Sequence, residues 1–202
     1  MPTICQICKE VFAKLEKDYF AAQQIDAFMQ NPYPEKSLEH LLYRKHHIDA
    51  VQWDLEDIIR DPEINPAEAL KLKRRIDKSN QDRTDLVEQI DDYFLLHYAD
   101  VQVQSNAGIN TESPAWAIDR LSILYLKIYH MSKQVVRSEV SEEHRQRCRT
   151  KLQVLLEQEK DLTTSIDELI EDIAQGRKYM KVYKQMKMYN DPSLNPVLYG
   201  KK

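Results

Sequence analysis

The chain has 202 residues, of which 31% are charged and three are glycine, and its formal net charge is −4. So few glycines exclude the glycine-rich phosphate loops of P-loop and Rossmann proteins, and no apolar run reaches the roughly 18 residues that a membrane span needs. Residues 1–20 lack the basic and apolar regions of a secretory signal. We therefore expect a cytoplasmic protein that forms a single helical domain over residues 1–202.

Five long helices are predicted from the capping signals along the chain. The first runs from about residue 3 to 29, before the prolines at 32 and 34. Serine caps predict starts at Ser37, Ser113 and Ser141, and Asn65-Pro66 predicts another. The later helices are expected at about 37–60, 67–98, 113–137 and from 141 to before Gly176.

The last of these helices carries a heptad-like apolar seam. Leu155, Leu162 and Leu169 follow one register, and Ile166 and Ile173 follow the other. Two such rows are typical of left-handed bundle packing. Long helices joined by short loops then predict an all-α, antiparallel up-and-down bundle over residues 1–174.

The C-terminal segment 175–202 differs in charge from this bundle. It holds seven basic residues against one acidic residue, a local charge of +6, which leaves −10 for the rest of the chain. We expect a basic helix over about 177–188 and an irregular tail after it. An acidic body with a basic end favours an anionic partner or self-association and disfavours general nucleic-acid binding.

The predicted third helix has polar residues inside its apolar row. The row comprises Leu72, Ile76, Asn80, Arg83, Val87, Ile90, Phe94 and His97. Asn80 and Arg83 interrupt it at mid-length, where an amide and a guanidinium must find partners or a ligand. A polar pocket is therefore predicted between the second, third and fourth helices.

A second polar row follows the predicted second helix. His46, Asp49, Trp53, Glu56 and Arg60 succeed one another at steps of three and four residues, which places them on one face. The row indicates either the wall of a metal or phosphate site or a solvated face with internal ion pairs.

The predicted pocket has ligand-binding and acid–base candidates. The ligand-binding candidates are Trp53, Glu56, Asp57, Asn80, Arg83, Arg120, Ser122 and Lys127. Arg83 and Arg120 would hold a phosphate or carboxylate, since planar guanidinium groups bind such anions through two hydrogen bonds. If chemistry occurs, His130 is the candidate acid or base, with Asp119 as a second catalytic candidate; a structural role for His130 stays open.

A magnesium site is a further possibility in the same region. Glu88-x-x-Asp91 and Asp54-x-x-Asp57 are spaced like the acidic pairs of all-helical nucleotide pyrophosphohydrolases, whose carboxylates hold Mg²⁺ against a diphosphate. The candidate metal ligands are Glu56, Asp57, Glu88 and Asp91. By contrast, the Glu-x-x-His motifs of di-iron bundles are missing from the sequence.

The chain contains a C-x-x-C motif, Cys5 to Cys8, and one further cysteine, Cys148. A zinc site would need more ligands than these thiols supply. We interpret all three cysteines as packing residues, with redox or metal chemistry as the alternative.

Four stretches of the sequence resemble a bacterial protein family known as domain of unknown function 4254. They are QWDLEDIIR at 52–60, NTESPAWAIDRLSIL at 110–124, LKIYHM at 126–131 and KMYNDP at 187–192. The resemblance extends over nearly the whole chain and implies one helical domain, but no activity. The chain departs from the family pattern at two positions, with His47 where the family usually has Trp and Asp54 where it usually has His. The second departure makes Asp54 less important as a metal ligand and weakens the pyrophosphohydrolase interpretation. The resemblance also implies genes that neighbour those of glycosyltransferases for surface polysaccharide, and hence a phosphorylated sugar or a glycosyltransferase as partner.

Three functional hypotheses follow. The first is an accessory protein of surface-polysaccharide assembly that binds a phosphorylated or anionic small molecule, such as a sugar phosphate or nucleotide sugar. The second is a Mg²⁺-dependent hydrolase of nucleotide or nucleotide-sugar diphosphates. The third is a structural module that binds a protein, such as a glycosyltransferase, through its basic tail.

Overall fold

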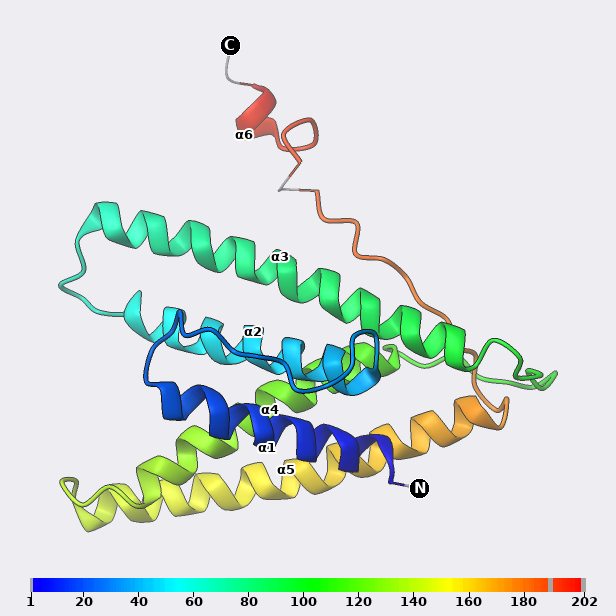
Figure 1. Ribbon diagram of the computed structural model, residues 1–202, viewed down its shortest axis with the longest axis horizontal. Coiled ribbons are helices and arrows are strands. Elements are labelled where there is room, and N and C mark those ends of the chain that lie inside the picture. Colours follow the sequence, from blue (N-terminus) through cyan, green and yellow to red (C-terminus); the bar gives the residue numbers. More distant parts are fainter. Residues whose placement is uncertain (1, 189–190, 201–202) are drawn as a thin grey trace.

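The computed structural model describes residues 2–188 and 191–200, and it confirms an all-α bundle with five long helices (Figure 1). No strand occurs within these two ranges. The helices are α1 (Ile4–Ala22), α2 (Leu38–Ile58), α3 (Pro66–His97), α4 (Pro114–Val135), α5 (Glu142–Ala174) and the short α6 (Pro196–Tyr199). None of the described helices is long and apolar enough to cross a membrane.

Local capping explains where four of the long helices begin. The side chains of Ser37, Asn65, Ser113 and Ser141 each accept hydrogen bonds from backbone N–H groups in the first turn that follows, as predicted. The first helix ends earlier than expected, because Gln23 adopts a left-handed conformation with φ 52° directly after Ala22.

The connection between α1 and α2 departs from strict up-and-down order. Residues 23–37 run back along the bundle, so α1 and α2 point in the same direction, whereas α2–α3 and α4–α5 form antiparallel hairpins (Figure 1). This connection must span the length of α2, about 30 Å at 1.5 Å per residue, which an extended segment achieves. Asn31 fixes its path by donating from its side-chain amide to the carbonyl oxygen of His40, at 3.0 Å.

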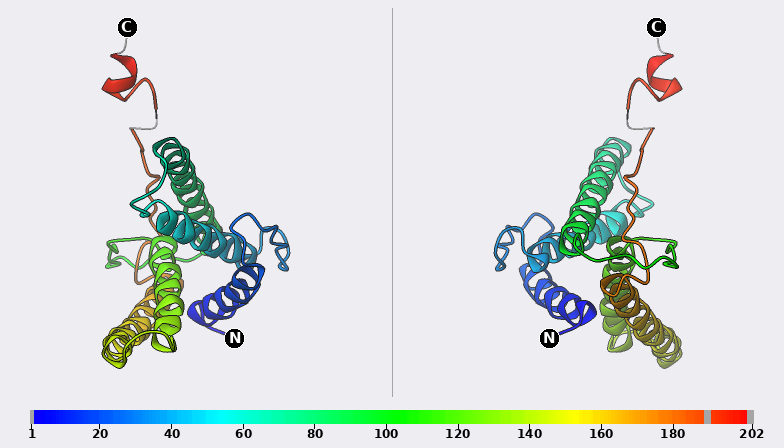
Figure 2. Two further views of the ribbon diagram at one scale, coloured as in Figure 1. Left: turned by 90° about the vertical axis from the view of Figure 1, so that its left-hand side faces the viewer. Right: turned by 90° about the vertical axis from the view of Figure 1, so that its right-hand side faces the viewer.

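Helix α2 lies at the centre of the bundle. End-on views place it between α3 on one side and α1 and α4 on the other, with α5 packed against α4 (Figure 2). The core between these helices includes Phe12, Leu42, Phe94 and Leu121, all fully buried. Polar side chains of α2 that point inward therefore meet α1, α3 and α4 at once.

The predicted seam of α5 is buried at its C-terminal end. Ile166, Leu169 and Ile173 are in the core, whereas Leu155 and Leu162 are partly exposed. The seam packs against α4 and α1. Towards its N-terminal end, α5 lines a cavity together with α4.

The cysteines are packing residues in this fold. Cys5, Cys8 and Cys148 are free and buried, and the Cys5 thiol donates to the carbonyl oxygen of Thr163. Burial raises the pKa of both the Cys5 and Cys8 thiols far above the ordinary value, and nearby Asp167 adds to the shift. Thiols that resist ionisation are poor nucleophiles and poor metal ligands.

Residues 179–188 are extended where the sequence predicts a basic helix. Their path begins with backbone hydrogen bonds to the loop before α4: Gly108 donates to Arg177 and accepts from Tyr179, both at 3.0 Å. These bonds satisfy backbone groups that a helix would have used internally.

The extended tail continues across α3, where its lysines contact polar groups of that helix. The Lys184 ammonium lies 3.0 Å from the Asp92 carboxylate, and Lys187 donates to the Thr84 hydroxyl at 2.8 Å. Attraction of Lys184 to Glu88 and Asp92 of α3 therefore stabilises the extended path. Four tail residues named in the sequence predictions, Tyr189, Asn190, Lys201 and Lys202, lie outside the described ranges.

Candidate functional site

Four charged side chains meet inside the bundle, and we call them the charge cluster: Lys45, Asp49, Arg83 and Asp119. Lys45 is 0% exposed and its ammonium pairs with Asp49 and, at 2.9 Å, with Asp119. The Arg83 Nε donates to Asp119 at 2.8 Å, its Nη2 pairs with the same carboxylate, and Nε lies 3.5 Å from Asp49. Two positive and two negative charges cancel, which is how a bundle tolerates such burial.

The two carboxylates of the charge cluster differ in acidity. Burial raises the pKa of Asp49 above its usual value, although Lys45 opposes the shift. Burial acts in the same direction on Asp119, but Lys45 and Arg83 together hold its pKa below the usual value. Asp119 thus stays ionised and anchors Arg83, whereas Asp49 accepts a proton more readily.

A chain of hydrogen bonds leads from Asp49 to α1, and we call its members the relay: Asp49, Ser122, His46 and Glu16. The Ser122 hydroxyl donates to Asp49 and lies 2.8 Å from His46 Nδ1. His46 Nε2 lies 3.4 Å from Glu16 Oε1. The imidazole is fully buried and stacks on Phe12, with ring centroids 4.4 Å apart.

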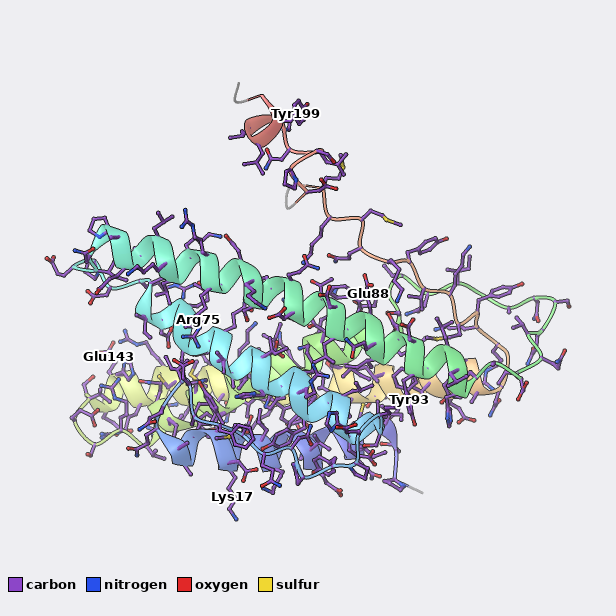
Figure 3. All side chains as sticks on the ribbon, turned by 45° about the horizontal axis from the view of Figure 1, so that its top comes forward. Lys17, Arg75, Glu88, Tyr93, Glu143 and Tyr199 are labelled. Atoms are coloured by element: carbon purple, nitrogen blue, oxygen red, sulfur yellow. The ribbon has the colours of Figure 1, made fainter. Side chains whose placement is uncertain are left out.

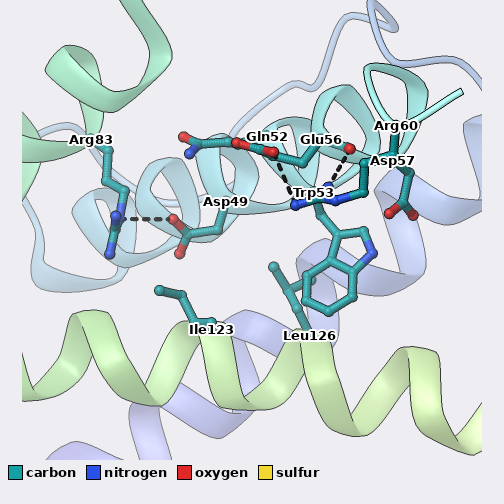
Figure 4. Close-up of a pocket in the computed structure, with 9 residues that line it drawn as sticks. All are labelled: Asp49, Gln52, Trp53, Glu56, Asp57, Arg60, Arg83, Ile123 and Leu126. Carbon is teal, nitrogen blue, oxygen red and sulfur yellow. Dashed lines mark hydrogen bonds and ion pairs between the residues drawn. The ribbon is translucent and has the colours of Figure 1, made fainter. Parts of the chain in front are cut away.

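Above the charge cluster lies a cavity of about 310 Å³, the Arg83 pocket, between α2, α3 and α4 (Figure 4). It is lined by Asp49, Gln52, Trp53, Glu56, Asp57, Arg60, Arg83, Ile123 and Leu126. Four predicted site residues therefore share it: Trp53, Glu56, Asp57 and Arg83. Asp49, Trp53, Glu56 and Arg60 of the polar row on α2 lie in its wall, whereas His46 does not.

A larger cavity of about 600 Å³, the Lys127 pocket, lies between α2, α4 and α5. It is lined by Trp53, Asp57, Lys127, His130, Met131, Gln134, Thr150, Lys151, Val154, Leu155 and Gln158. Trp53 and Asp57 line both cavities, so the two pockets are neighbours that meet at the indole. Lys151 was not among the predicted site residues, because nothing in the local sequence distinguishes it from other surface lysines of a charged helix.

Two cations of the Lys127 pocket lack an internal partner. Neither Lys127 nor Lys151 forms a hydrogen bond or ion pair with any described residue. His130 stacks on Trp53, with ring centroids 4.5 Å apart and an interplanar angle of 4°, and its buried Nε2 also has no partner in the described ranges. Burial lowers the His130 pKa, against the opposing effect of Asp54 and Asp57.

The structure separates Arg83 from Arg120, which were expected to bind one anion together. Arg120 is exposed and pairs with Glu112 at 3.1 Å. It lines a further pocket of about 590 Å³ with Lys127 and Ile123. The two arginines thus pair with different carboxylates, Asp119 and Glu112.

Two of the expected ligand-binding residues lie beside or beneath the pockets. The Asn80 side chain accepts a hydrogen bond from Gln52 at 2.9 Å, which fixes the pocket-lining amide. Ser122 is fully buried within the relay and cannot reach a ligand directly. Both residues support groups that line the Arg83 pocket.

The four candidate metal ligands do not converge. Glu88 lies on α3 beside the tail and accepts from the backbone N–H of Gln185 at 2.9 Å (Figure 3). Asp91 accepts from the Ser113 hydroxyl at 2.6 Å and the Ala115 N–H at 3.2 Å, and so holds the start of α4. Within residues 2–188 and 191–200, no three His, Cys, Asp or Glu side chains are arranged to hold a metal ion.

Comparison with known proteins adds a family but no activity. No curated protein and no solved structure matches this chain. One family model matches residues 39–182, a range that contains every residue lining the Arg83 and Lys127 pockets. Because that match covers most of the chain, the protein belongs to the family described as protein of unknown function DUF4254.

Proposed function

We propose that this protein binds an anionic small molecule, with a phosphate or carboxylate in the Lys127 pocket. The observation that carries this proposal is a set of three groups around one cavity that have no partner among residues 2–188 and 191–200: the exposed ammonium groups of Lys127 and Lys151 and the buried Nε2 of His130. Arg83 and Arg120, by contrast, are already paired with carboxylates. An anion that enters between these two exposed lysines can accept a charge-assisted hydrogen bond from each.

The neighbouring Arg83 pocket supports a ligand with a polar second part. Gln52, Glu56 and Arg60 form one polar wall, in which Glu56 and Arg60 pair with each other at 3.2 Å, and Trp53 presents an apolar ring at the junction of the two cavities. Convergent polar groups on a partly apolar surface suit a hydroxyl-rich ring attached to the anion. A sugar phosphate or nucleotide sugar has this form and accords with an accessory role in surface-polysaccharide assembly.

A protein partner is a second candidate, and the exposed tail favours it. Tyr183 and Met186 are 72% and 84% exposed while Lys184 is held by α3, so the extended segment presents apolar side chains outward. Removal of residues 177–202 would then abolish a complex with a glycosyltransferase but leave small-molecule binding intact. The hydrolase hypothesis has less support, because Glu88 and Asp91 are engaged elsewhere.

Calorimetric titration tests the main proposal, with pyrophosphate, glucose 1-phosphate and a uridine diphosphate sugar as probes. We expect at least one probe to bind, and the Lys127→Ala/Lys151→Ala double variant to lose about 10-fold or more in affinity. Lys160→Ala is the matched control, because it removes the same charge from an exposed position of α5 outside the described pockets. The absence of binding by all three probes, or equal affinity in the double variant, would overturn the proposal.

A further inference from the structure

With Asp49 ionised between Lys45 and Arg83, the protons of the relay have one arrangement. A serine hydroxyl has one proton, and Ser122 donates it to Asp49. The hydroxyl must therefore accept from His46, which places the imidazole proton on Nδ1. Burial, with Lys45 and His47 nearby, keeps the His46 pKa well below its usual value, so the ring is neutral and Nε2 is bare.

A bare Nε2 facing Glu16 requires a proton on the carboxyl group. The contact of 3.4 Å is a hydrogen bond only if Glu16 donates it, because neither a carboxylate nor a bare ring nitrogen has a proton to share. Burial supplies the condition, since it raises the pKa of Glu16 to about 7. Glu16, His46 and Ser122 then all donate in one direction, toward Asp49.

We propose that the Arg83 pocket is an anion subsite whose charge is set by proton transfer along this relay. In one concerted shift, Glu16 gives its proton to His46 Nε2, His46 gives the Nδ1 proton to Ser122, and Ser122 gives its proton to Asp49. Each member then donates in the reverse direction. No proton enters or leaves, and one negative charge moves from Asp49 to Glu16.

The shift changes the electrostatics of the pocket. With Asp49 ionised, the charge cluster is neutral: Lys45 and Arg83 offset Asp49 and Asp119. With Asp49 protonated, the cluster carries a net charge of +1, and the guanidinium of Arg83 faces the cavity with one carboxylate partner instead of two. An anion in the Arg83 pocket is attracted to this state.

The negative charge moves to a position that tolerates it. The Glu16 side chain is 17% exposed, whereas that of Asp49 is 4% exposed, so the transferred charge gains solvent. The other charged and titratable groups that act on the relay are Lys45 and His47 from α2, Asp119 from α4 and Arg83 from α3. Anion binding and proton position are therefore coupled through a contiguous chain of hydrogen bonds.

The inference rests on the proposed function only for the ligand's class, since it uses different residues. The test is nitrogen-15 NMR of histidine-labelled protein, with pyrophosphate as the probe and His46 assigned from a His46→Gln variant. We expect His46 to carry its proton on Nδ1 in the free protein and on Nε2 at saturation. The outcome that contradicts this is a saturated protein in which His46 keeps the Nδ1 proton.

Glu16→Gln supplies the matched variant. Its amide donates to Nε2 as the protonated acid does but cannot release a proton to the ring. The His46 proton should therefore stay on Nδ1 when pyrophosphate is added, and the affinity for pyrophosphate should fall about 10-fold. Glu10→Gln removes an exposed carboxylate from the same helix and should bind like the wild type. Equal affinity in the two variants would overturn the relay.

The Lys127→Ala/Lys151→Ala double variant separates this inference from the proposed function. Suppose that the double variant loses pyrophosphate binding and that His46 of the wild type keeps its proton on Nδ1 at saturation. The proposed function then stands and the relay is wrong. If the double variant still binds pyrophosphate with the change at His46, the relay stands and the Lys127 pocket is not the anion site. If the wild type binds no pyrophosphate at all, the relay is wrong, and the proposed function falls with it only if glucose 1-phosphate and the uridine diphosphate sugar also fail to bind.

Discussion

The indole of Trp53 and the imidazole of His130 lie parallel, with ring centroids 4.5 Å apart and an interplanar angle of 4°. This stack joins α2 to α4 at the boundary of the Arg83 and Lys127 pockets. A neutral imidazole stacks on indole as an aromatic ring does, whereas an imidazolium becomes a cation over the ring face. The stack therefore reports the protonation state of His130.

Tryptophan fluorescence should follow the titration of His130. Burial lowers the His130 pKa from its usual value of 6.5, so we expect the quenching that accompanies protonation to begin only below that pH. An anion beside Lys127 favours imidazolium and should raise the midpoint. The measurement uses a Trp116→Phe background, because the chain has two tryptophans. His130→Gln is the control, and a titration that persists in it would contradict the assignment.

Asp91 should stabilise the fold and bind no magnesium. Asp91→Ala leaves the Ser113 hydroxyl and the Ala115 N–H without their buried acceptor, which should lower the free energy of unfolding by about 1–3 kcal/mol. Asp92→Ala, at the exposed neighbour, should cost less than about 1 kcal/mol. Urea unfolding measures both. A rise in wild-type Tm with Mg²⁺ that only Asp91→Ala abolishes would instead assign the carboxylate to a metal.

The sequence predicts features that depend on neighbouring residues in the chain. Ser113 and Asn65 cap their helices through contacts two or three residues away, and Arg83 is visible as a charge within an apolar row. The sequence does not predict which residues the buried charged groups contact. Lys45 pairs with Asp119 across 74 positions, and no local pattern announces that contact.

The conformation of the tail also depends on residues that are distant in the sequence. Its lysines, spaced three residues apart, suit an amphipathic helix, and a sequence window contains nothing against one. The extended path depends on Gly108, roughly 70 residues earlier, and on the acids of α3. Long-range backbone pairing overrides local helix propensity here.

Glu16 should make stability depend on pH. The folded carboxyl group keeps its proton up to a pKa of about 7, whereas the unfolded chain releases it near 4.5. Between these values the folded state binds more protons, so the free energy of unfolding falls as pH rises and levels off above about 7. The loss should be about 1–3 kcal/mol, and Glu16→Gln should remove it. Denaturation series at pH 4.5 and 7.5 measure it, and an equal loss in Glu16→Gln and Glu10→Gln would contradict the prediction.

Gly176 should be required for the turn that directs the tail back to the loop before α4. It has φ +70°, and an added Cβ would lie 2.3 Å from the carbonyl oxygen of Gln102. Gly176→Ala combines a left-handed conformation with a backbone clash, so we expect a loss of about 1–3 kcal/mol in the free energy of unfolding. Gly108→Ala is the matched control, because nothing lies within 4 Å of its added Cβ. Hydrogen exchange at the Gln104 and Gly108 N–H groups, which donate to Gly176 and Arg177, should accelerate in Gly176→Ala. Unchanged exchange at both amides would show that the turn does not hold the tail.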